Sequence, residues 1–328
     1  MNIIYKKIAL IAILAFILIG CASSQAPETT IGGNTVEIED NHGLVEVPIN
    51  PEKLVVLDSR IMETLQAWDI KLVATAKAVL PEDSGYIADE SVADLGNHRE
   101  PNLELLASLE PELVIIGQRF AGFYEEIKTL LPQSVVIDLN IDVSEKATTP
   151  GENLVQGFKN NTLVLGKIFE KETEAEAIVT TFESAISNAK EAYNGSENVM
   201  GVIVSGDKIG FSAPRFGRVW GPLFDILDLD PALLVEDATT NHQGDNISSE
   251  SIAQSNPDWL LVLDRDAAVS TTVDATPAKE VIEDSEALET ATAIKNGQVV
   301  YAPVDTYTNE SIQTYTEIFE ILAAAFNK

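Results

Sequence analysis

A long stretch without strand signals divides this chain into two regions. Residues 153–193 contain no proline, and their apolar side chains recur at intervals of mostly three and four, with charged residues mainly between them. That spacing is typical of an amphipathic helix. About 35 helical residues would extend about 50 Å, which exceeds one small lobe. The sequence therefore predicts one long helix that joins two lobes, has weak points at Gly157 and Gly166, and ends at Asn194-Gly195.

Apolar strand-like runs alternate with helical patterns on both sides of this helix. A hairpin is predicted first, with strands at 35–38 and 44–47 around a turn at 40–43. Further strands are predicted at 54–57, 72–74, 113–116, 134–137, 199–204, 209–212, 259–263 and 299–302. Helices are predicted at 62–68, 102–108, 120–130, 219–227, 248–254, 278–282 and 310–326. This alternation is typical of βαβ units, and it predicts an α/β fold with two Rossmann-like lobes, residues 35–152 and 196–328, joined by a single long helix at 153–195.

The amino terminus indicates where the protein works. Lys6 and Lys7 precede an apolar run at 8–19 that is too short to span a bilayer comfortably, which predicts a signal peptide over 1–20. The ending Leu18-Ile19-Gly20-Cys21 resembles a bacterial lipobox, in which Cys21 would carry the lipid, although a plain signal peptide with a stray cysteine is the alternative. Residues 21–34 have the composition of a flexible tether. A lipobox fits a Gram-positive surface and a periplasm equally well.

Composition excludes several classes of function. Cys21 is the only cysteine, so the chain can form no internal disulfide and has no thiol nucleophile in its body. The formal net charge is −31, and without Lys6 and Lys7 the balance is 19 basic against 52 acidic residues. Nucleic acids require a basic surface, so they are excluded as partners. The same charge keeps the body off anionic lipid, which leaves the lipid on Cys21 as the membrane attachment.

Three of the six arginines directly follow apolar strand-like runs. They are Arg119, Arg215 and Arg265. The carboxyl ends of strands line the crevice where open α/β sheets bind their ligands. Scarce, planar and permanently charged donors at that edge of an acidic protein predict an anion site. The alternative is that each arginine pairs with one of the many surface carboxylates.

Several segments in a fixed order make the chain resemble the substrate-binding lipoproteins of iron-siderophore ABC importers. These segments are residues 45–57, 101–104, 109–114, the connecting helix, 214–217 (Pro-Arg-Phe-Gly), 247–250 and 256–258. This branch of the periplasmic binding proteins also carries cobalamin and haem. The resemblance implies two lobes joined by one rigid helix, a ligand cleft between them, small closure on binding, and a monomer that delivers its ligand to permease and ATPase subunits.

Within that family, the chain is most similar to the subgroup that binds ferric catecholates. The resemblance implies a triad of arginines at Arg119, Arg215 and Arg265 around the anionic complex, with His242 and Tyr307 completing the iron coordination. Tyr301 or Tyr315 are alternatives to Tyr307. Guanidinium groups suit catecholate oxygens because they stay charged and donate in a planar fork. A bis-catecholate leaves part of the iron's coordination sphere open to these side chains, whereas a tris-catecholate does not.

Other residues are predicted as contacts of the cleft or of the permease. His98 and Arg99 are predicted at the rim, with a surface pair between Arg99 and Glu100 as the alternative reading. Trp220 borders the ligand or packs in the core. Glu104 and Glu250 each begin a short helix, one in each lobe, and the resemblance implies that they dock onto arginines of the permease. A carboxylate in the first turn of a helix is also favourable in itself.

Three other functions are alternatives to the binding of a ferric catecholate. A divalent metal site needs several converging histidines and carboxylates, and arginines beside it would repel a bare cation. An enzyme would need a catalytic motif, and the sequence contains no Gly-x-Ser-x-Gly, His-Glu-x-x-His or phosphate-binding glycine loop. The third alternative keeps the transporter class and changes the cargo to a ferric hydroxamate, haem or cobalamin. We expect no intrinsic cofactor, since ferric iron enters as part of the ligand.

Overall fold

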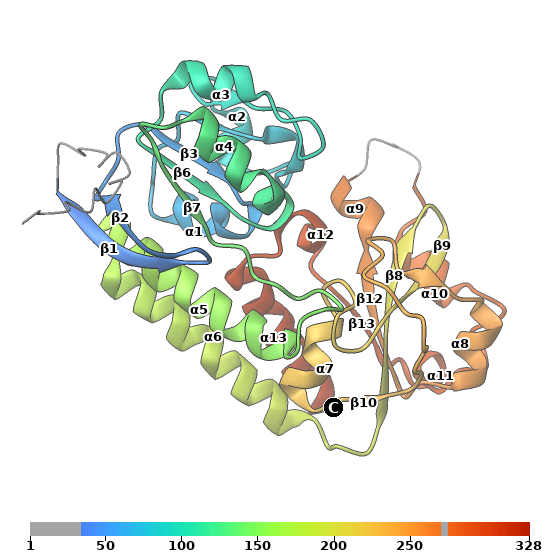
Figure 1. The fold of residues 1–328 in the computed structure, drawn as a ribbon. Coiled ribbons are helices and arrows are strands. Elements are labelled where there is room, and N and C mark those ends of the chain that lie inside the picture. The colour runs from blue at the N-terminus through green and yellow to red at the C-terminus, as the bar shows by residue number, and fades with distance from the viewer. Residues whose placement is uncertain (1–33, 270–274) are drawn as a thin grey trace, which may run out of the picture. The chain divides into compact units, whose positions relative to one another are not determined.

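The computed structural model describes residues 34–269 and 275–328 (Figure 1). The expected signal peptide and Cys21 lie outside these residues, as does most of the expected tether. Among the described helices, none has the length and apolar character needed to cross a bilayer.

The predicted hairpin is confirmed. Strand β1 (Thr35–Asp40) pairs antiparallel with β2 (Gly43–Pro48). Gly43 takes a φ of 119°, a conformation that favours glycine, and the side chain of Asp40 accepts a hydrogen bond from the backbone of His42 at 2.8 Å. The ring of His42 stacks on Tyr124 with 3.6 Å between ring centroids. The hairpin is therefore held against the first lobe by its turn.

The first lobe contains a parallel sheet with the strand order β5-β4-β3-β6-β7. Its strands are β3 (Leu54–Leu57), β4 (Ala74–Thr75), β5 (Ala93–Asp94), β6 (Leu113–Ile116) and β7 (Val135–Asp138). Leu54 and Val56 belong to one hydrophobic core, and the alternate residues Val55 and Leu57 belong to another on the opposite face. Unbroken apolar runs form these strands because helices cover both faces of the sheet. The helical segments are η1 (Ser59–Ile61), α1 (Met62–Ala67), η2 (Lys77–Val79), α2 (Gly85–Ala88), α3 (Leu103–Leu109), η3 (Gln118–Phe123) and α4 (Tyr124–Leu130).

The second lobe contains a mixed sheet with the order β11-β9-β8-β12-β13, and β10 pairs with β8. Its strands are β8 (Asn198–Ser205), β9 (Lys208–Ser212), β10 (Asp230–Pro231), β11 (Asp245–Asn246), β12 (Trp259–Asp264) and β13 (Val299–Tyr301). Strands β8, β12 and β13 are parallel, whereas β9 runs antiparallel to β8. The helices are α7 (Gly221–Leu227), α8 (Ser249–Ser255), α9 (Arg265–Val269), α10 (Ala278–Glu283), α11 (Thr292–Asn296), α12 (Thr306–Asn309) and α13 (Ile312–Phe326). The predicted α/β fold of two lobes is confirmed.

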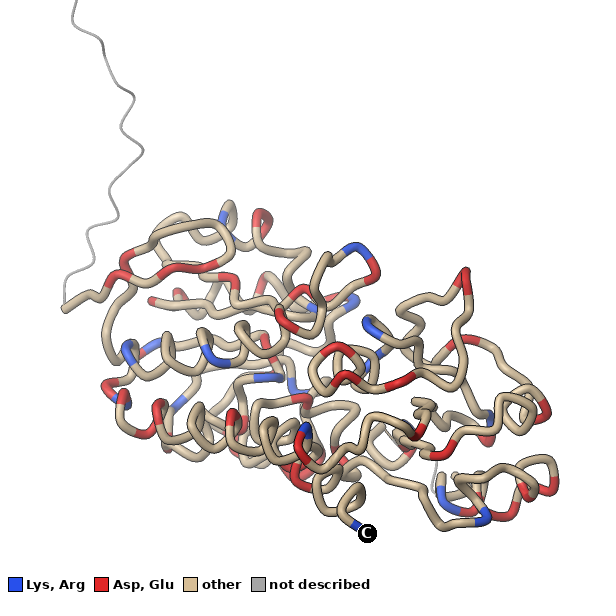
Figure 2. The backbone as a smooth tube through the Cα atoms, turned by 90° about the horizontal axis from the view of Figure 1, so that it is seen from below, with Lys and Arg blue, Asp and Glu red and all other residues tan. Residues whose placement is uncertain are grey.

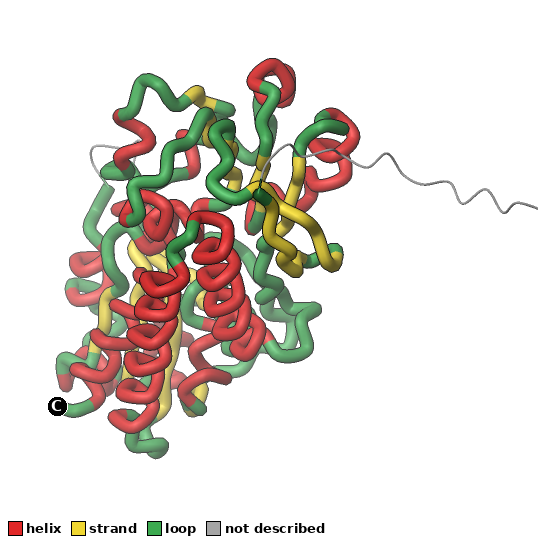
Figure 3. The backbone as a smooth tube through the Cα atoms, turned by 90° about the vertical axis from the view of Figure 1, so that its left-hand side faces the viewer, coloured by secondary structure: helices red, strands yellow, loops and turns green. Residues whose placement is uncertain are grey.

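The long helix expected at 153–195 is divided into two. Helix α5 (Pro150–Phe169) ends at Glu170, which takes a left-handed φ of 52°, and α6 (Glu172–Ala192) returns alongside it (Figure 3). The two helices approach closely at Gly166, where an added Cβ would lie 2.8 Å from the Cβ of Ala175. The prediction of one unbroken helix over 153–195 is therefore wrong, although α5 does reach both lobes. Its Phe158 packs in the core of the second lobe and its Ile168 in that of the first.

Helices α12 and α13 also connect the lobes. Helix α13 packs along α6, and its Phe319 meets Phe182 with 5.9 Å between ring centroids. At its other end, the hydroxyl of Ser311 donates a hydrogen bond of 2.5 Å to the carboxylate of Glu63 in α1. The segment that carries α12 is thus bonded to the first lobe and packed into the second.

Candidate ligand-binding site

A cavity of about 390 Å³ lies where the two lobes face each other, and its lining is strongly basic. It is lined by Ala78, Val79, His98, Arg99, Arg119, Arg218, His242, Arg265, Val269, Tyr307 and Thr308. Four of the chain's six arginines are in this set, and none of the lining residues is a carboxylate. Figure 2 shows how sparse basic residues are elsewhere along a backbone rich in acidic ones. The cavity therefore concentrates positive charge within an acidic protein.

Arg119 enters the cavity from the carboxyl end of β6, as expected from its place in the sequence. Its Nη1 donates to the side chains of Gln118 at 3.2 Å and Ser59 at 3.4 Å, and its Nη2 donates to the backbone oxygen of Tyr307 at 3.5 Å. Burial, followed by the nearby guanidinium of Arg218, lowers the pKa of Arg119. Arginine nevertheless stays charged, so Arg119 brings to the cavity wall a cation that has no direct ion pair among the described residues.

The strand end that precedes Arg119 is shaped by a buried carboxyl group. Asp58 accepts a hydrogen bond from the backbone of Arg60 at 3.0 Å, and burial raises the pKa of Asp58 to about 6. Gly117 lies against it: an added Cβ at Gly117 would come within 2.1 Å of the Asp58 carboxylate oxygen. Only glycine permits this approach, which brings the end of β6 close to the end of β3.

The expectation that Arg215 lies in the cleft was wrong, and Arg218 occupies that place. Arg215 is 53% exposed, pairs with Asp225 at 3.4 Å, and donates to the backbone oxygen of Thr148 at 2.9 Å. The prediction assumed that β9 ends at the same edge as its neighbours. Because β9 is antiparallel, its last residue, Ser212, lies opposite Gly201 in the middle of β8.

A tight turn then brings Arg218 to the cavity. The backbone N–H of Gly217 bonds to the oxygen of Ala213 at 2.8 Å, and an added Cβ at Gly217 would meet the Ala213 nitrogen at 2.3 Å. The oxygen of Arg218 accepts a hydrogen bond from Ser212 at 3.1 Å. The side chain of Arg218 is only 17% exposed. The local sequence does not mark it, because the antiparallel direction of β9 is set by its pairing with β8.

Arg265 and Tyr307 follow the parallel strands β12 and β13. The guanidinium carbon of Arg218 lies 4.0 Å from the centre of the Tyr307 ring and that of Arg265 lies 5.1 Å from it. Arg265 also donates to Ser205 at 3.1 Å and contacts Asp266 at 3.5 Å. Such cation–π contacts orient the guanidinium groups without neutralising them.

Tyr301 and Tyr315 do not line this cavity, although Tyr315 lines the one that adjoins it. Tyr301 donates to Glu283 at 3.3 Å, and Tyr315 is buried. Trp220 is fully buried in the core of the second lobe, so of its two predicted positions only core packing holds. Its Cβ would lie 2.8 Å from an added Cβ at Gly201.

The surroundings lower the pKa of both histidines of the cavity, which favours the neutral form. Burial is the largest cause that lowers the pKa of His98 and of His242, and the guanidinium groups around them act in the same direction. The Nδ1 atom of His98 is buried without a hydrogen-bond partner among the described residues. The loop of His242 packs on Gly210, where an added Cβ would meet the Gln243 oxygen at 2.1 Å. Neutral imidazoles are able to coordinate a metal ion that a ligand brings with it.

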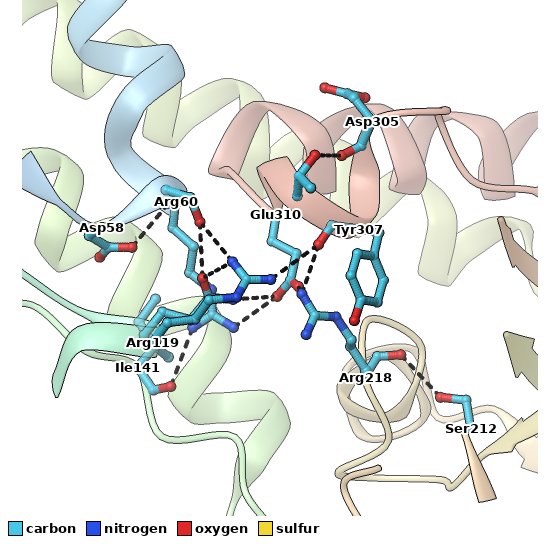
Figure 4. A network of polar contacts seen from close by, with 12 residues as sticks. Asp58, Arg60, Arg119, Ile141, Ser212, Arg218, Asp305, Tyr307 and Glu310 are labelled. Carbon is cyan, nitrogen blue, oxygen red and sulfur yellow. Dashed lines mark hydrogen bonds and ion pairs between the residues drawn. The ribbon is translucent and has the colours of Figure 1, made fainter. Parts of the chain in front are cut away.

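A buried carboxylate lies behind the cavity (Figure 4). Glu310 is 3% exposed and pairs with Arg60 at 3.1 Å and with Arg218. Burial acts to raise the pKa of Glu310, but Arg218, Arg60 and Arg119 together hold it below its ordinary value. Glu310 is therefore ionised, and it was not among the residues predicted from the sequence.

The remaining cavities have a different character. A cavity of about 720 Å³ lies along α5 and β7 and is lined by five carboxylates and one lysine, so it does not suit an anion. A cavity of about 270 Å³ adjoins the basic one and shares Arg218 with it. Within residues 34–269 and 275–328, no group of three His, Cys, Asp or Glu side chains is arranged to hold a metal ion.

Glu104 and Glu250 are both exposed and occupy equivalent positions in the two lobes. Glu104 lies in the first turn of α3, which Asn102 caps, and Glu250 in the first turn of α8, which Ser248 caps. Each helix ends in a left-handed residue followed by a proline and a strand. Arg99, in turn, has no ion-pair partner among the described residues, so the pair with Glu100 is not seen.

A sequence model described as periplasmic binding protein matches residues 54–306, and several known proteins match most of this chain. The petrobactin-binding protein YclQ of Bacillus subtilis is 29% identical over 306 residues, which cover 90% of each chain. The ferric-anguibactin-binding protein FatB of Vibrio anguillarum is 28% identical over 297 residues, covering 88% of this chain and 87% of its own. The structure of the periplasmic catecholate-siderophore binding protein VctP of Vibrio cholerae is 23% identical and has a TM-score of 0.72, over 89% of this chain and 100% of its own.

Proposed function

Because this chain belongs to the periplasmic binding protein family, a family of binding proteins rather than enzymes, we propose that its ligand is an anionic ferric siderophore of the catecholate type. Its class is that of the substrate-binding proteins of ABC importers for iron and siderophores. The observation that carries the proposal is the cavity lined by four arginines and no carboxylate.

The arginines account for the preference for an anion. Catecholate oxygens leave a ferric complex negatively charged, and the guanidinium groups of Arg119, Arg218 and Arg265 supply planar, permanently charged donors. Arg99 adds a fourth at the exposed rim. A ferric hydroxamate is near neutral, so this concentration of positive charge would attract it only weakly.

The iron itself would complete the set of contacts. If the ligand is a bis-catecholate, the open positions of the iron are available to the neutral imidazole of His242 and the phenol oxygen of Tyr307. Both residues line the cavity, and the guanidinium groups of Arg218 and Arg265 both lie over the ring of Tyr307. Among the similar proteins, VctP is named for a catecholate siderophore and FatB for ferric anguibactin, which supports a ferric or catecholate ligand.

Delivery and location belong to the same proposal. Lipidation at Cys21 would hold the protein on the outer side of the cell membrane. The exposed carboxylates of Glu104 and Glu250, one in each lobe, would pair with cationic residues of the permease. Exposed pairs of this kind contribute orientation more than affinity.

Quenching of tryptophan fluorescence tests the proposed cargo. We would titrate the protein with a ferric bis-catecholate, a ferric tris-catecholate, a ferric hydroxamate, haem and cobalamin, and use each iron-free chelator as a control. The ferric catecholates should bind with the lowest dissociation constants. Tighter binding of the hydroxamate, haem or cobalamin would refute the catecholate assignment and leave the importer class in place.

A further inference from the structure

Glu310 receives hydrogen bonds from both lobes although it does not line the basic cavity. From the first lobe, Arg60 Nη2 and Gln118 Nε2 both donate to its Oε2 atom at 3.1 Å. From the second lobe, Arg218 Nη2 pairs with its Oε1 atom. Both oxygens of this buried carboxylate therefore accept hydrogen bonds from arginine or glutamine side chains, and Glu310 lines the adjoining cavity of about 270 Å³ rather than the basic one.

These contacts restrict the guanidinium of Arg218 from several directions. Its Nη2 also donates to the backbone oxygen of Tyr307 at 2.8 Å, and its planar face lies on the Tyr307 ring. Glu310 and Tyr307 therefore both engage Nη2, whereas no described residue hydrogen-bonds to Nη1, which we expect to face the ligand. Holding a donor in place before binding reduces the loss of side-chain freedom on binding.

The same carboxylate offsets repulsion between cations. Arg60, Arg119 and Arg218 come together at the turn of α12, and Arg119 shares the Tyr307 oxygen with Arg218. Without an anion among them, these like charges would repel each other in a poorly solvated place. Glu310 thus permits two of them to stay at the cavity wall.

We propose that Glu310 is a positioning residue of the ligand site: it holds Arg218, and with it Arg119, in the geometry that receives the ligand, without touching the ligand itself. This inference rests on the proposed function for its binding readout. The opposite hypothesis is that Glu310 competes with the ligand for the guanidinium of Arg218. Removing a positioning carboxylate weakens binding, whereas removing a competing one strengthens it.

The test measures the affinity of Glu310→Gln for the ferric complex of a linear bis-catecholamide by fluorescence quenching. We expect affinity to fall by roughly 10- to 100-fold, the range for loss of a hydrogen bond to a charged group. Glu320→Gln, an exposed position on α13, should bind like the wild type. Equal or tighter binding by Glu310→Gln would overturn the proposal.

A double-mutant cycle separates positioning from a general effect on folding. If Glu310 acts through Arg218, then Arg218→Gln/Glu310→Gln should bind no more weakly than Arg218→Gln alone. Fully additive losses would contradict the inference. Thermal unfolding of each variant checks that the compared proteins are folded.

A second pair of variants serves if Glu310→Gln does not fold. Arg60→Met/Glu310→Leu removes both buried charges together, which is better tolerated than leaving one of them unpaired. We expect it to bind more weakly than Arg60→Met, and its ligand-free crystal structure should show Arg218 displaced from the Tyr307 ring. An Arg218 side chain that keeps its position in that structure would refute the inference, whether or not the wild type binds a ferric complex. Failure of the wild type to bind any of the ferric complexes would refute the proposed function instead.

Discussion

Two arginines that lie three positions apart in the sequence have opposite environments. Arg215 is solvated beside Asp225, and Arg218 is largely buried beside Glu310 and Tyr307. The residues share a turn, so their substitutions make a matched pair. We expect Arg218→Gln to weaken binding of a ferric bis-catecholate by roughly 10- to 100-fold, because a charge-assisted contact is lost. Arg215→Gln should leave affinity unchanged.

Titrations of both variants beside Arg119→Gln and Arg265→Gln would complete the comparison. The two additional variants should lose affinity to a similar degree as Arg218→Gln. A larger loss for Arg215→Gln than for Arg218→Gln would show that the cavity described here is not where the ligand binds.

The proposed coordination by His242 has a defined pH dependence. Burial and the neighbouring arginines lower the pKa of His242, so the neutral imidazole persists down to a pH below the ordinary value of about 6.5. Protonation at still lower pH would remove a metal ligand. Affinity for a bis-catecholate should therefore be constant at neutral pH and then fall by up to about tenfold per pH unit on acidification.

His242→Gln is the control for this pH profile. Acid also protonates the catecholate itself, and comparing the variant with the wild type in the same solutions cancels that contribution. The difference between the two affinities should shrink as the pH falls. A constant ratio across the range would contradict coordination by His242.

Sequence reasoning identified part of the lining of the basic cavity because strand ends are visible in a sequence. Arg119 and Arg265 follow parallel strands, and both reach the cavity. Arg218 was missed because strand direction is set by partners in space, and β9 turned out antiparallel. Glu310 was missed for a related reason: the contacts that define it come from residues more than ninety positions away.

At the scale of elements, the break between α5 and α6 has the clearest physical cause. Gly166 lets the helices touch, and Glu170 turns the chain in a left-handed conformation without glycine. Most helices that end in this way use glycine, so the sequence did not signal the break. The apolar periodicity predicted the helices themselves correctly, since both bury one face.

Substitution of Gly166 tests the importance of that contact. Replacing glycine by alanine inside a helix ordinarily stabilises it by about 1 kcal/mol. At Gly166 the added methyl would meet Ala175, so Gly166→Ala should instead lower the free energy of unfolding by about 1–3 kcal/mol. Gly122→Ala, where an added Cβ meets nothing within 4 Å, is the control. Urea unfolding measures both, and a Gly166→Ala protein as stable as the wild type would contradict the packing described.

At the scale of the whole molecule, binding and delivery should be separable. The exposed carboxylates of Glu104 and Glu250 lie outside the basic cavity. We expect Glu104→Arg/Glu250→Arg to bind the ferric ligand as the wild type does and to fail in uptake of the iron-55 complex by cells. Glu125→Arg, also exposed, should support uptake. Normal uptake by the double variant would exclude the proposed docking role.

The arrangement of the two lobes was predictable where it follows from alternation and strand length. The contacts that join them were not, because they depend on side chains such as Glu63 and Ser311 that are remote in sequence. Helix α5 belongs to both cores, and α12 and α13 bond to both lobes. These shared elements oppose large independent movement of the lobes.

The small basic cavity within a strongly acidic chain also has a kinetic consequence. At physiological ionic strength, charge is screened beyond about 8 Å, so an approaching anion meets the repulsive acidic surface before it senses the arginines. Added salt weakens that outer repulsion more than the enclosed contacts. The association rate of the ligand should therefore increase as salt is added. High affinity would then come from a low dissociation rate, because the arginines that hold the ligand are enclosed.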